Sequence, residues 1–566
     1  MADLPPPVQG PTAKEKKYDR QLRLWGATGQ MALENAHILL VNSGPGVVGL
    51  ETLKNLVLPG VGQFTIQDSA VVSEADLGVS FFVEEEDLGR FRAEATCNRL
   101  KELNPDVQGH FVAEPVESFL TQPDSLKPYT LILVAAPIRP DILSKLSAHA
   151  DASLVPLFYF HSVGFYSHFS IHLPPAYPIV ETHPDIETTS DLRLLKPWKE
   201  LADFAADKTK GLDAMAAEDH GHVPYIALLL HYIEEWKQSR DGKPPSSYKD
   251  KTTFRDEVIA KAARTNNAEG GEENFDEAVA AVLKSLNPPE PNGAVKDIFK
   301  TKECLALSAD SASFWVIAHA IGQFYTKHGV LPVPGSVPDM KARSADYIQL
   351  QNVYKSKARK DVEEVVESVR SLERSLNRST PIEEKDIEAF CKNAAHIKLV
   401  RGRPFHVVQA GETIKWGDRA KSIAQTLTFP GSLIPLYIAF LAWDEFAATH
   451  DKDALGGAPK VAGEGDSEVD TDNEKVTGIA LKTLNDLVKE ASASIEENEL
   501  STIKEQTGEF AQELVRAGGA ELHNISSLTG GLISQEIIKV ITEQYIPVDN
   551  TCIFDGVKSK TEVLRV

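Results

Sequence analysis

Residues 37–60 read HILLVNSGPGVVGLETLKNLVLPG, and this stretch decides the fold class. The aliphatic run HILLVN is typical of a buried parallel strand. It leads directly into a glycine-rich loop, and the residues after the loop have helical spacing up to Pro59-Gly60. The next segment, GQFTIQD (62–68), alternates like a strand. Together these segments predict one βαβ unit with a glycine-rich first turn.

Later segments continue the same pattern. The residues RFRAEATCNRLKELNP (90–105) predict a helix, and three segments predict strands: VQGHFVA (107–113), YTLILVAAP (129–137) and DASLVPLFYFHS (151–162). Strands that alternate with helices at this spacing are typical of a parallel sheet covered on both faces. Residues 1–173 are therefore expected to form the N-terminal part of a doubly wound, Rossmann-like α/β domain.

The rest of the chain divides into two parts. Residues 174–400 carry mostly helical periodicity and predict a large helical insertion. Residues 401–566 are expected to return to the α/β domain, because they end in an amphipathic helix and two short strands, NTCIFDG (550–556) and SKTEVLRV (559–566).

Two features of this last part add to the picture. A stretch rich in glycine and acids predicts a mobile, solvated acidic loop at about 451–475, with Glu464–Glu474 as its acidic portion. Apolar helices near Leu433–Trp443 and Ile533–Ile541 are candidates for the core or for an interface.

The composition is that of a globular protein: 566 residues, of which 42% are hydrophobic and 25% charged. The 59 basic and 82 acidic residues give a net charge of −23, which argues against broad binding of nucleic acid or of an anionic membrane. The first residues contain no apolar targeting segment, and the longest apolar run, Leu433–Trp443, is too short to span a bilayer. We expect a soluble chain of the cytosol or nucleus.

The glycine loop itself contains Gly44, Gly46 and Gly49 in a GxGxxG pattern between a strand and a helix. Such a loop lets an anion approach the helix N-terminus, and Asp68, 19 residues beyond Gly49, stands where a ribose-binding carboxylate would. On its own the loop leaves three interpretations open: a nucleotide pocket, a nicotinamide-dependent oxidoreductase, or an inherited turn that binds nothing.

The residues ahead of the loop favour one of these interpretations. The lead-in YDRQLRLWGATGQ (18–30), together with SASFWVIAHAI (311–321), YIQLQNVYKSKARKD (347–361) and GGLISQEIIKVIT (530–542), resembles the ubiquitin-activating enzyme family. Within that family the combination is similar to one subgroup, the regulatory subunits of heterodimeric neddylation-activating enzymes, also called amyloid-precursor-protein-binding proteins. The resemblance implies a ThiF/MoeB-like adenylation fold, whose helical insertion corresponds to half of the catalytic-cysteine domain.

The resemblance also implies partners and a reaction. A catalytic subunit would use Mg-ATP to adenylate a ubiquitin-like modifier of the neddylation pathway, capture it as a cysteine thioester and pass it to a conjugating enzyme. This chain would support that reaction as the regulatory half of the heterodimer. Three alternatives remain: a self-sufficient activating enzyme, a scaffold or signalling adaptor of the same fold, and the corresponding subunit of the sumoylation pathway.

Several nucleotide-binding positions differ from those of active family members. In active members an aspartate, an asparagine, an arginine, a glutamine and a lysine hold the nucleotide. The matching positions here are Asp68, Asp76, Val79, Ser80 and Arg92, of which only Asp68 is kept. A magnesium-binding aspartate is replaced by Ala136. The pocket is expected to lack the positive charge and the metal ligand that Mg-ATP requires, so the loop is interpreted as a remnant and the chain as binding neither cofactor nor metal.

Arg20 is the one candidate for a direct part in catalysis. By resemblance, the arginine of this lead-in motif reaches across the heterodimer interface to the ATP phosphates of the catalytic subunit, as an arginine finger in trans. The alternative is that Arg20 caps or pins its own N-terminal helix.

Other clusters receive structural interpretations. The four cysteines, Cys97, Cys304, Cys391 and Cys552, form no CxxC pair or zinc pattern, so we expect reduced thiols, none of them the thioester-forming nucleophile. Asp219, His220 and His222 are interpreted as part of the loop ahead of a helix rather than as metal ligands. The basic group Lys355, Lys357, Arg359 and Lys360 is interpreted as a solvated helix face, with contact to an acidic partner as the alternative.

Overall fold

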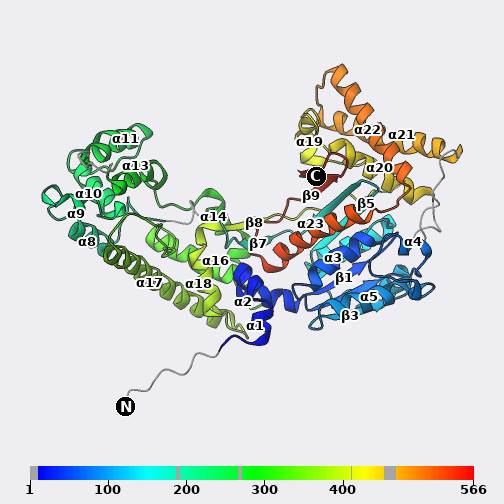
Figure 1. Ribbon diagram of the computed structural model, residues 1–566, viewed down its shortest axis with the longest axis horizontal. Coiled ribbons are helices and arrows are strands. Elements are labelled where there is room, and N and C mark those ends of the chain that lie inside the picture. Colours follow the sequence, from blue (N-terminus) through cyan, green and yellow to red (C-terminus); the bar gives the residue numbers. More distant parts are fainter. Residues whose placement is uncertain (1–9, 186–190, 265–270, 409–410, 451–466) are drawn as a thin grey trace, which may run out of the picture. The chain divides into compact units, whose positions relative to one another are not determined.

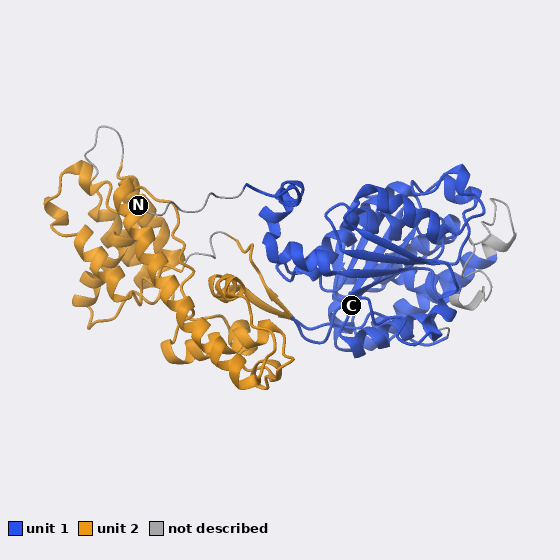
Figure 2. Cartoon of the chain, turned by 90° about the horizontal axis from the view of Figure 1, so that it is seen from below, with its two compact units in different colours: residues 1–177, 400–566 blue, residues 178–399 orange. Residues whose placement is uncertain are grey.

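The computed structural model describes residues 10–185, 191–264, 271–408, 411–450 and 467–566. These residues form two compact units, shown in blue and orange in Figure 2. Unit 1 comprises Met1–Tyr177 and Val400–Val566, and unit 2 comprises Pro178–Leu399. No helix in the described part of the chain combines the length and the apolar character needed to cross a membrane.

Unit 1 is built on an eight-stranded sheet in the order β10-β9-β6-β5-β4-β1-β2-β3. Its strands are β1 (His37–Val41), β2 (Gln63–Gln67), β3 (Gln108–Val112), β4 (Leu131–Ala135), β5 (Leu157–Val163), β6 (Tyr166–His172), β9 (Thr551–Asp555) and β10 (Lys560–Leu564). The strands from β3 to β5 pair in parallel, whereas β6, β9 and β10 are antiparallel to their neighbours. The predicted α/β class is confirmed, and each predicted strand is present. Strand β6 was missed, because its seven residues, YSHFSIH, are all buried but include two serines and two histidines, so that it lacks the aliphatic run expected of a buried strand.

Helices cover both faces of this sheet (Figure 1). Helices α3 (Val47–Val57) and α23 (His523–Thr542) lie side by side on one face. They can approach closely because Gly530 of α23 has no side chain: a Cβ there would lie 2.8 Å from the backbone nitrogen of Thr52. On the opposite face, Leu39 and Val41 of β1 pack against helix α7 (Pro140–Ser153). The carboxyl ends of the parallel strands are thereby left for the loops that could form a site.

The remaining helices of unit 1 come from the N-terminal and the C-terminal segments of its sequence. The N-terminal group is α1 (Ala13–Lys17) and α2 (Asp19–Asn35); the sheet-flanking helices also include α4 (Glu74–Leu77), α5 (Arg92–Leu103) and α6 (Val116–Thr121). The C-terminal group is α19 (Ala420–Leu427), α20 (Ile434–His450), α21 (Ser467–Ala491) and α22 (Glu497–Ala517). This second group shares one apolar core with Tyr166 of β6 and Ile553 of β9, so the apolar helix predicted near Leu433–Trp443 belongs to the core.

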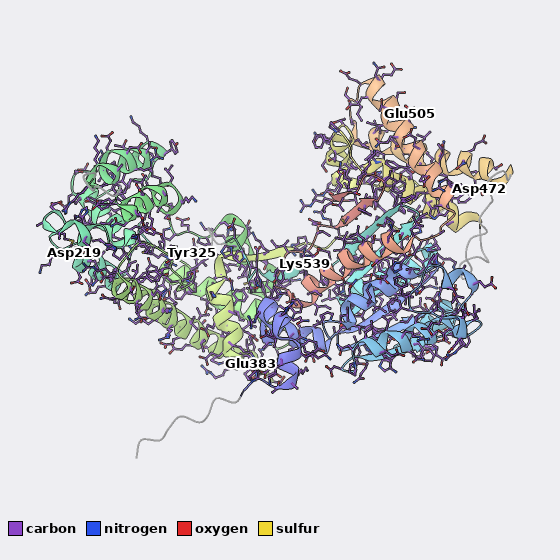
Figure 3. All side chains as sticks on the ribbon, viewed as in Figure 1. Asp219, Tyr325, Glu383, Asp472, Glu505 and Lys539 are labelled. Carbon is purple, nitrogen blue, oxygen red and sulfur yellow. The ribbon has the colours of Figure 1, made fainter. Side chains whose placement is uncertain are left out.

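The predicted acidic loop needs a correction at its C-terminal end. Residues 451–466 lie outside the described residues, but residues 467–475 are helical, because α21 begins at Ser467. That helix is held by buried apolar residues at helical spacing, Val476, Ala480, Leu484 and Leu487. Acidic side chains lie on the outer surface of helices α21 and α22, as Asp472 on α21 and Glu505 on α22 illustrate (Figure 3).

Unit 2 is mostly helical. Its helices are α8 (Lys199–Lys208), α9 (Ala217–His220), α10 (Tyr225–Gln238), α11 (Tyr248–Thr253), α12 (Ala260–Ala262), α13 (Glu273–Ser285), α14 (Gly293–Ile298), α15 (Lys302–Leu305), α16 (Ser313–His328), α17 (Ser344–Leu376) and α18 (Glu384–Lys392). A two-stranded sheet of β7 (Tyr177–Val180) and β8 (Ile397–Val400) joins the beginning and end of this segment. The unit has its own apolar core, centred on the buried face of α10.

Candidate functional site: an internally filled nucleotide loop

The glycine loop connects the carboxyl end of β1 to the first turn of α3. Gly44 (φ 57°) and Gly46 (φ 67°) both adopt the left-handed conformation that favours glycine. A Cβ on Gly46 would lie 2.2 Å from the side chain of Asn42, so no larger residue fits there. The loop thus has the predicted geometry, and it directs the N-terminus of α3 towards the edge where a phosphate would bind.

That helix N-terminus already has an anion beside it. The carboxylate of Glu521, just before α23, accepts hydrogen bonds from the backbone N–H groups of Val47 (3.2 Å) and Val48 (2.8 Å). The hydroxyl of Ser526 donates a further hydrogen bond to the same carboxylate. Glu521 is only 3% exposed, and burial raises the pKa of its carboxyl group. A side chain of this chain therefore takes the hydrogen bonds that a bound phosphate would take.

Asp68, expected to face a ribose, also has an internal partner. The guanidinium of Arg92 donates to Asp68 Oδ2 (2.8 Å), to Asp76 Oδ1 (2.9 Å) and to the backbone oxygen of Gly44 (2.8 Å). Asn42 donates to Asp68 as well, at 3.0 Å. Burial disfavours the guanidinium charge, but the two carboxylates outweigh it and raise the pKa of Arg92.

The expectation that the pocket lacks positive charge was therefore wrong in its detail. Arg92 places a cation at the centre of the loop, but Asp68 and Asp76 neutralise it. Asp76, which stands where active family members have an asparagine, is part of this ion-pair network. The contacts that Arg92 makes with Asp68, Asp76 and Gly44 therefore alter the loop more than the loss of the nucleotide-binding residue types does.

Two of the other altered positions, Val79 and Ser80, follow helix α4. Val79 is partly buried, and the hydroxyl of buried Ser80 accepts a hydrogen bond from the backbone of Phe82. Next to Ala136, Pro137 lies so close to the loop that a Cβ on Gly44 would be 2.7 Å from its Cδ atom. The cavity at the loop, which Asn42, Gly44, Asp68, Arg92 and Pro137 help to line, has a volume of about 100 Å³, whereas ligand pockets usually measure about 300–1,000 Å³.

Arg20 lies on the first turn of α2, away from this loop's contacts. Its neighbour Tyr18 is buried and attaches the helix to the α/β domain, since its hydroxyl accepts from Asn104 (3.0 Å) and donates to Asp106 (3.1 Å). Arg20 is exposed, and within the described residues its side chain makes no hydrogen bond or ion pair. Arg23, one turn on, pairs with Asp19 at 3.0 Å. In the part of the chain that the structure describes, no side-chain contact of Arg20 pins its own helix.

All four cysteines are free and buried. Burial raises the pKa of the Cys97, Cys304 and Cys552 thiols to about 11 and that of Cys391 to about 12. A thiol in such an apolar setting is a poor nucleophile at neutral pH. The geometry therefore gives no cysteine the features of a thioester-forming residue.

The histidine group in unit 2 is not brought together. His220 Nδ1 lies 2.7 Å from Glu272, His222 Nδ1 lies 2.6 Å from the backbone oxygen of Glu218, and Asp219 pairs with Arg343.

The basic group on α17 has local partners. Lys357 pairs with Asp361 on its own helix, and Lys360 pairs with Glu200 at 2.8 Å. Lys355 and Arg359 are exposed, as a solvated helix face requires.

A glycine loop, a mostly parallel sheet and a lead-in helix define an adenylation-type α/β protein, and comparisons with known proteins agree. The profile of the ThiF family matches residues 18–566. A "NEDD8-activating enzyme E1 regulatory subunit" of Xenopus laevis is 36% identical over 547 residues, which cover 96% of this chain and 97% of that protein. The protein of that name from Danio rerio is 34% identical over 98% of this chain and 99% of its own length.

A plant relative extends the match. The "NEDD8-activating enzyme E1 regulatory subunit AXR1" of Arabidopsis thaliana is 33% identical over 97% of this chain and 96% of its own. Among solved structures, Escherichia coli MccB with ATP has 17% identity over 28% of this chain and 49% of that one, with a TM-score of 0.25, a likeness too slight to carry an argument. The chain belongs to the ThiF family and, within it, to the NEDD8-activating enzyme E1 regulatory subunits.

Proposed function

We propose that this chain is the non-catalytic half of a heterodimeric activating enzyme. Its catalytic partner binds Mg-ATP, adenylates the C-terminus of a ubiquitin-like modifier of the neddylation pathway, forms the thioester and delivers the modifier to a conjugating enzyme. This chain binds no nucleotide or metal for that reaction. The names of the full-length relatives support the regulatory role. The four free cysteines favour the cytosol or nucleus as its location.

One observation supports the proposal that the chain's own glycine loop binds no nucleotide: Glu521 accepts hydrogen bonds from the first N–H groups of α3. A phosphate oxygen placed about 4 Å from this carboxylate would be repelled by about 4 kcal/mol at an effective dielectric constant of about 20. That repulsion corresponds to about a 1,000-fold loss of affinity. A nucleotide would in addition have to separate Arg92 from Asp68.

Calorimetric titration of the full chain with Mg-ATP tests this point. The expected result is no detectable binding at micromolar nucleotide, and no pyrophosphate exchange by the chain alone. Magnesium-dependent binding with micromolar affinity would overturn the proposal and favour a self-sufficient enzyme.

The regulatory role is tested in the reconstituted heterodimer. If Arg20 contacts the partner's ATP phosphates, Arg20→Ala should slow pyrophosphate exchange by roughly 100- to 1,000-fold, as expected for losing one placed electrostatic donor. The matched control is Arg23→Ala, because Arg23 is also exposed on α2 but pairs with Asp19. Both variants should co-elute with the partner in gel filtration. Equal rates of pyrophosphate exchange for the Arg20→Ala and Arg23→Ala heterodimers would show that Arg20 has no part in the reaction. A wild-type heterodimer that catalyses no exchange would indicate that the chain is a scaffold.

A further inference from the structure

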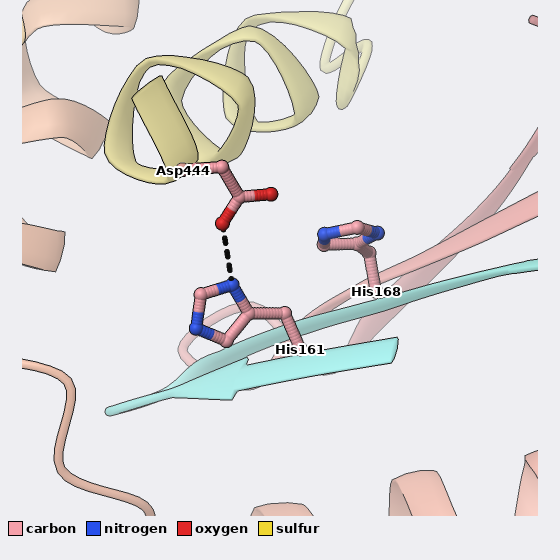
Figure 4. A group of neighbouring side chains, drawn as sticks. All are labelled: His161, His168 and Asp444. Carbon is pink, nitrogen blue, oxygen red and sulfur yellow. Dashed lines mark ion pairs between the residues drawn. The ribbon is translucent and has the colours of Figure 1, made fainter. Parts of the chain in front are cut away.

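A second group of polar side chains lies inside unit 1, away from the glycine loop. His161 on β5 and His168 on β6 are direct partners in the antiparallel pairing of these strands. Directly opposite side chains on such a pair project from the same face, with Cβ atoms about 5 Å apart. Asp444 of α20 lies over them from the helix layer (Figure 4). Both histidines are 2% exposed.

Three of the four ring nitrogens of these histidines lack a hydrogen-bond partner in the described structure. His161 Nδ1 lies 3.0 Å from Asp444 Oδ1, yet the contact does not have hydrogen-bond geometry. Neither ring nitrogen of His168 has a partner. Leaving a buried polar atom unpaired costs about 1–3 kcal/mol. Several such atoms facing one space indicate that something else satisfies them.

The negative charge of Asp444 also indicates that the group binds a cation. The Asp444 side chain is only 15% exposed, and among the described residues His161 is the one basic group within ion-pair distance of it. The hydroxyl of Tyr159 donates to Asp444 Oδ2 at 2.8 Å and so leaves Oδ1 for the histidines. Phe440 packs edge-on against His168, with ring centroids 4.6 Å apart. A carboxylate oriented by an outer hydrogen bond and enclosed by apolar groups is a common feature of metal sites.

We propose that His161, His168 and Asp444 bind one Zn²⁺ ion, with a water molecule as the fourth ligand. Two imidazoles and one carboxylate are ligands that zinc prefers. One ligand atom from each residue lies within 4.8 Å of the others. Tetrahedral zinc at about 2.1 Å from each ligand places ligand atoms about 3.4 Å apart, so side-chain shifts of about 1 Å complete the site.

The position of this site gives it a structural consequence. His161 and His168 precede the helical insertion in the chain, and Asp444 follows it. The ion therefore joins the two sequence segments that make up unit 1, by attaching the β5–β6 hairpin to α20. Because a folded site binds the ion and the unfolded chain has no such site, zinc stabilises unit 1.

Metal content of the full chain tests the proposal. Protein stripped with a chelator is incubated with micromolar ZnCl₂, passed through a desalting column and analysed by mass spectrometry for zinc. One Zn²⁺ per chain is expected. His168→Phe should abolish retention while preserving an aromatic ring against Phe440, and Tyr159→Phe should weaken binding by roughly 10- to 100-fold, as losing an outer hydrogen bond does.

The matched control is His172→Phe. His172 is an equally buried histidine on the same strand, but it faces Asp151 at 2.8 Å and lies outside the cluster. The control should retain one Zn²⁺, and zinc should raise the midpoint of thermal unfolding in wild type and control but not in His168→Phe. Should His168→Phe fail to fold, Asp444→Asn provides the second test. No zinc uptake by the stripped wild type, or equal uptake by the cluster variants, would overturn the proposal.

Discussion

Replacing Arg92 by alanine removes the centre of the network that fills the glycine loop. The Arg92 side chain is 6% exposed, and those of Asp68 and Asp76 are 4% and 7% exposed. Arg92→Ala leaves both carboxylates buried without their cation. It also leaves the backbone oxygen of Gly44 without the hydrogen bond it accepts from Arg92.

The expected loss of stability follows from these contacts. Removing one partner of a buried ion pair typically costs about 3–5 kcal/mol. Asp68 keeps its hydrogen bond from Asn42, and Asp76 keeps those from the backbone N–H and hydroxyl of Ser73, so the cost should be near the lower limit, about 3 kcal/mol. That is a large fraction of the 5–15 kcal/mol by which domains are usually stable.

Urea unfolding of the full chain, followed by circular dichroism, measures this loss as a lower midpoint of the transition of unit 1. Arg99→Ala is the matched control, because Arg99 lies on the same helix and pairs with Glu84 at 2.7 Å, but at the surface where solvent screens the pair. Arg92→Met combined with Asp68→Asn and Asp76→Asn should recover most of the loss, since no buried charge remains. If Arg92→Ala destabilised the chain no more than Arg99→Ala, the ion-pair argument would be refuted.

Two further predictions concern groups with shifted pKa values. Because the pKa of Glu521 is raised above 4.5, its charge destabilises the folded state at neutral pH, and this penalty disappears as pH falls towards 4.5. In urea unfolding, wild type should therefore gain stability relative to Glu521→Gln as pH falls over that interval. A stability difference that does not change with pH would contradict this. The second concerns the four cysteines, whose thiol pKa values of about 11 to 12 leave only about 0.01% thiolate or less at pH 7: Cys97, Cys304, Cys391 and Cys552. Iodoacetamide should therefore leave all four thiols unmodified in the native chain and alkylate all four in urea. Rapid alkylation of any one of them in the native chain would refute its burial.

The parts of the fold that could be predicted are those encoded locally. HILLVN, the glycines after it and the helical spacing up to Pro59 specify a strand, a turn and a helix within one short segment. The positive φ values of Gly44 and Gly46 have the same local cause. Strand β6 was not predicted because it is buried yet rich in serine and histidine, so it lacks the aliphatic run by which other buried strands were recognised.

The contacts that decide the site depend on tertiary structure. Glu521 lies 473 residues from Val48 in sequence, and no local pattern connects them. Asp444 likewise meets His161 only because the chain returns to unit 1 after the insertion. Arg92 was identified as a changed position, but its partners could not be inferred, because position in sequence does not fix the direction of a long side chain.

The filled loop gives a physical reason why a nucleotide-type turn would persist in a chain that, as we propose, uses no nucleotide. The N-terminus of α3 requires an anion or other acceptors for its first N–H groups, whatever its function. In a nucleotide-binding protein, the ligand meets this need only when bound. Here Glu521 meets it permanently, and Arg92 meets the complementary need of Asp68. These internal contacts hold the loop without ATP, which fits the regulatory role proposed for this chain.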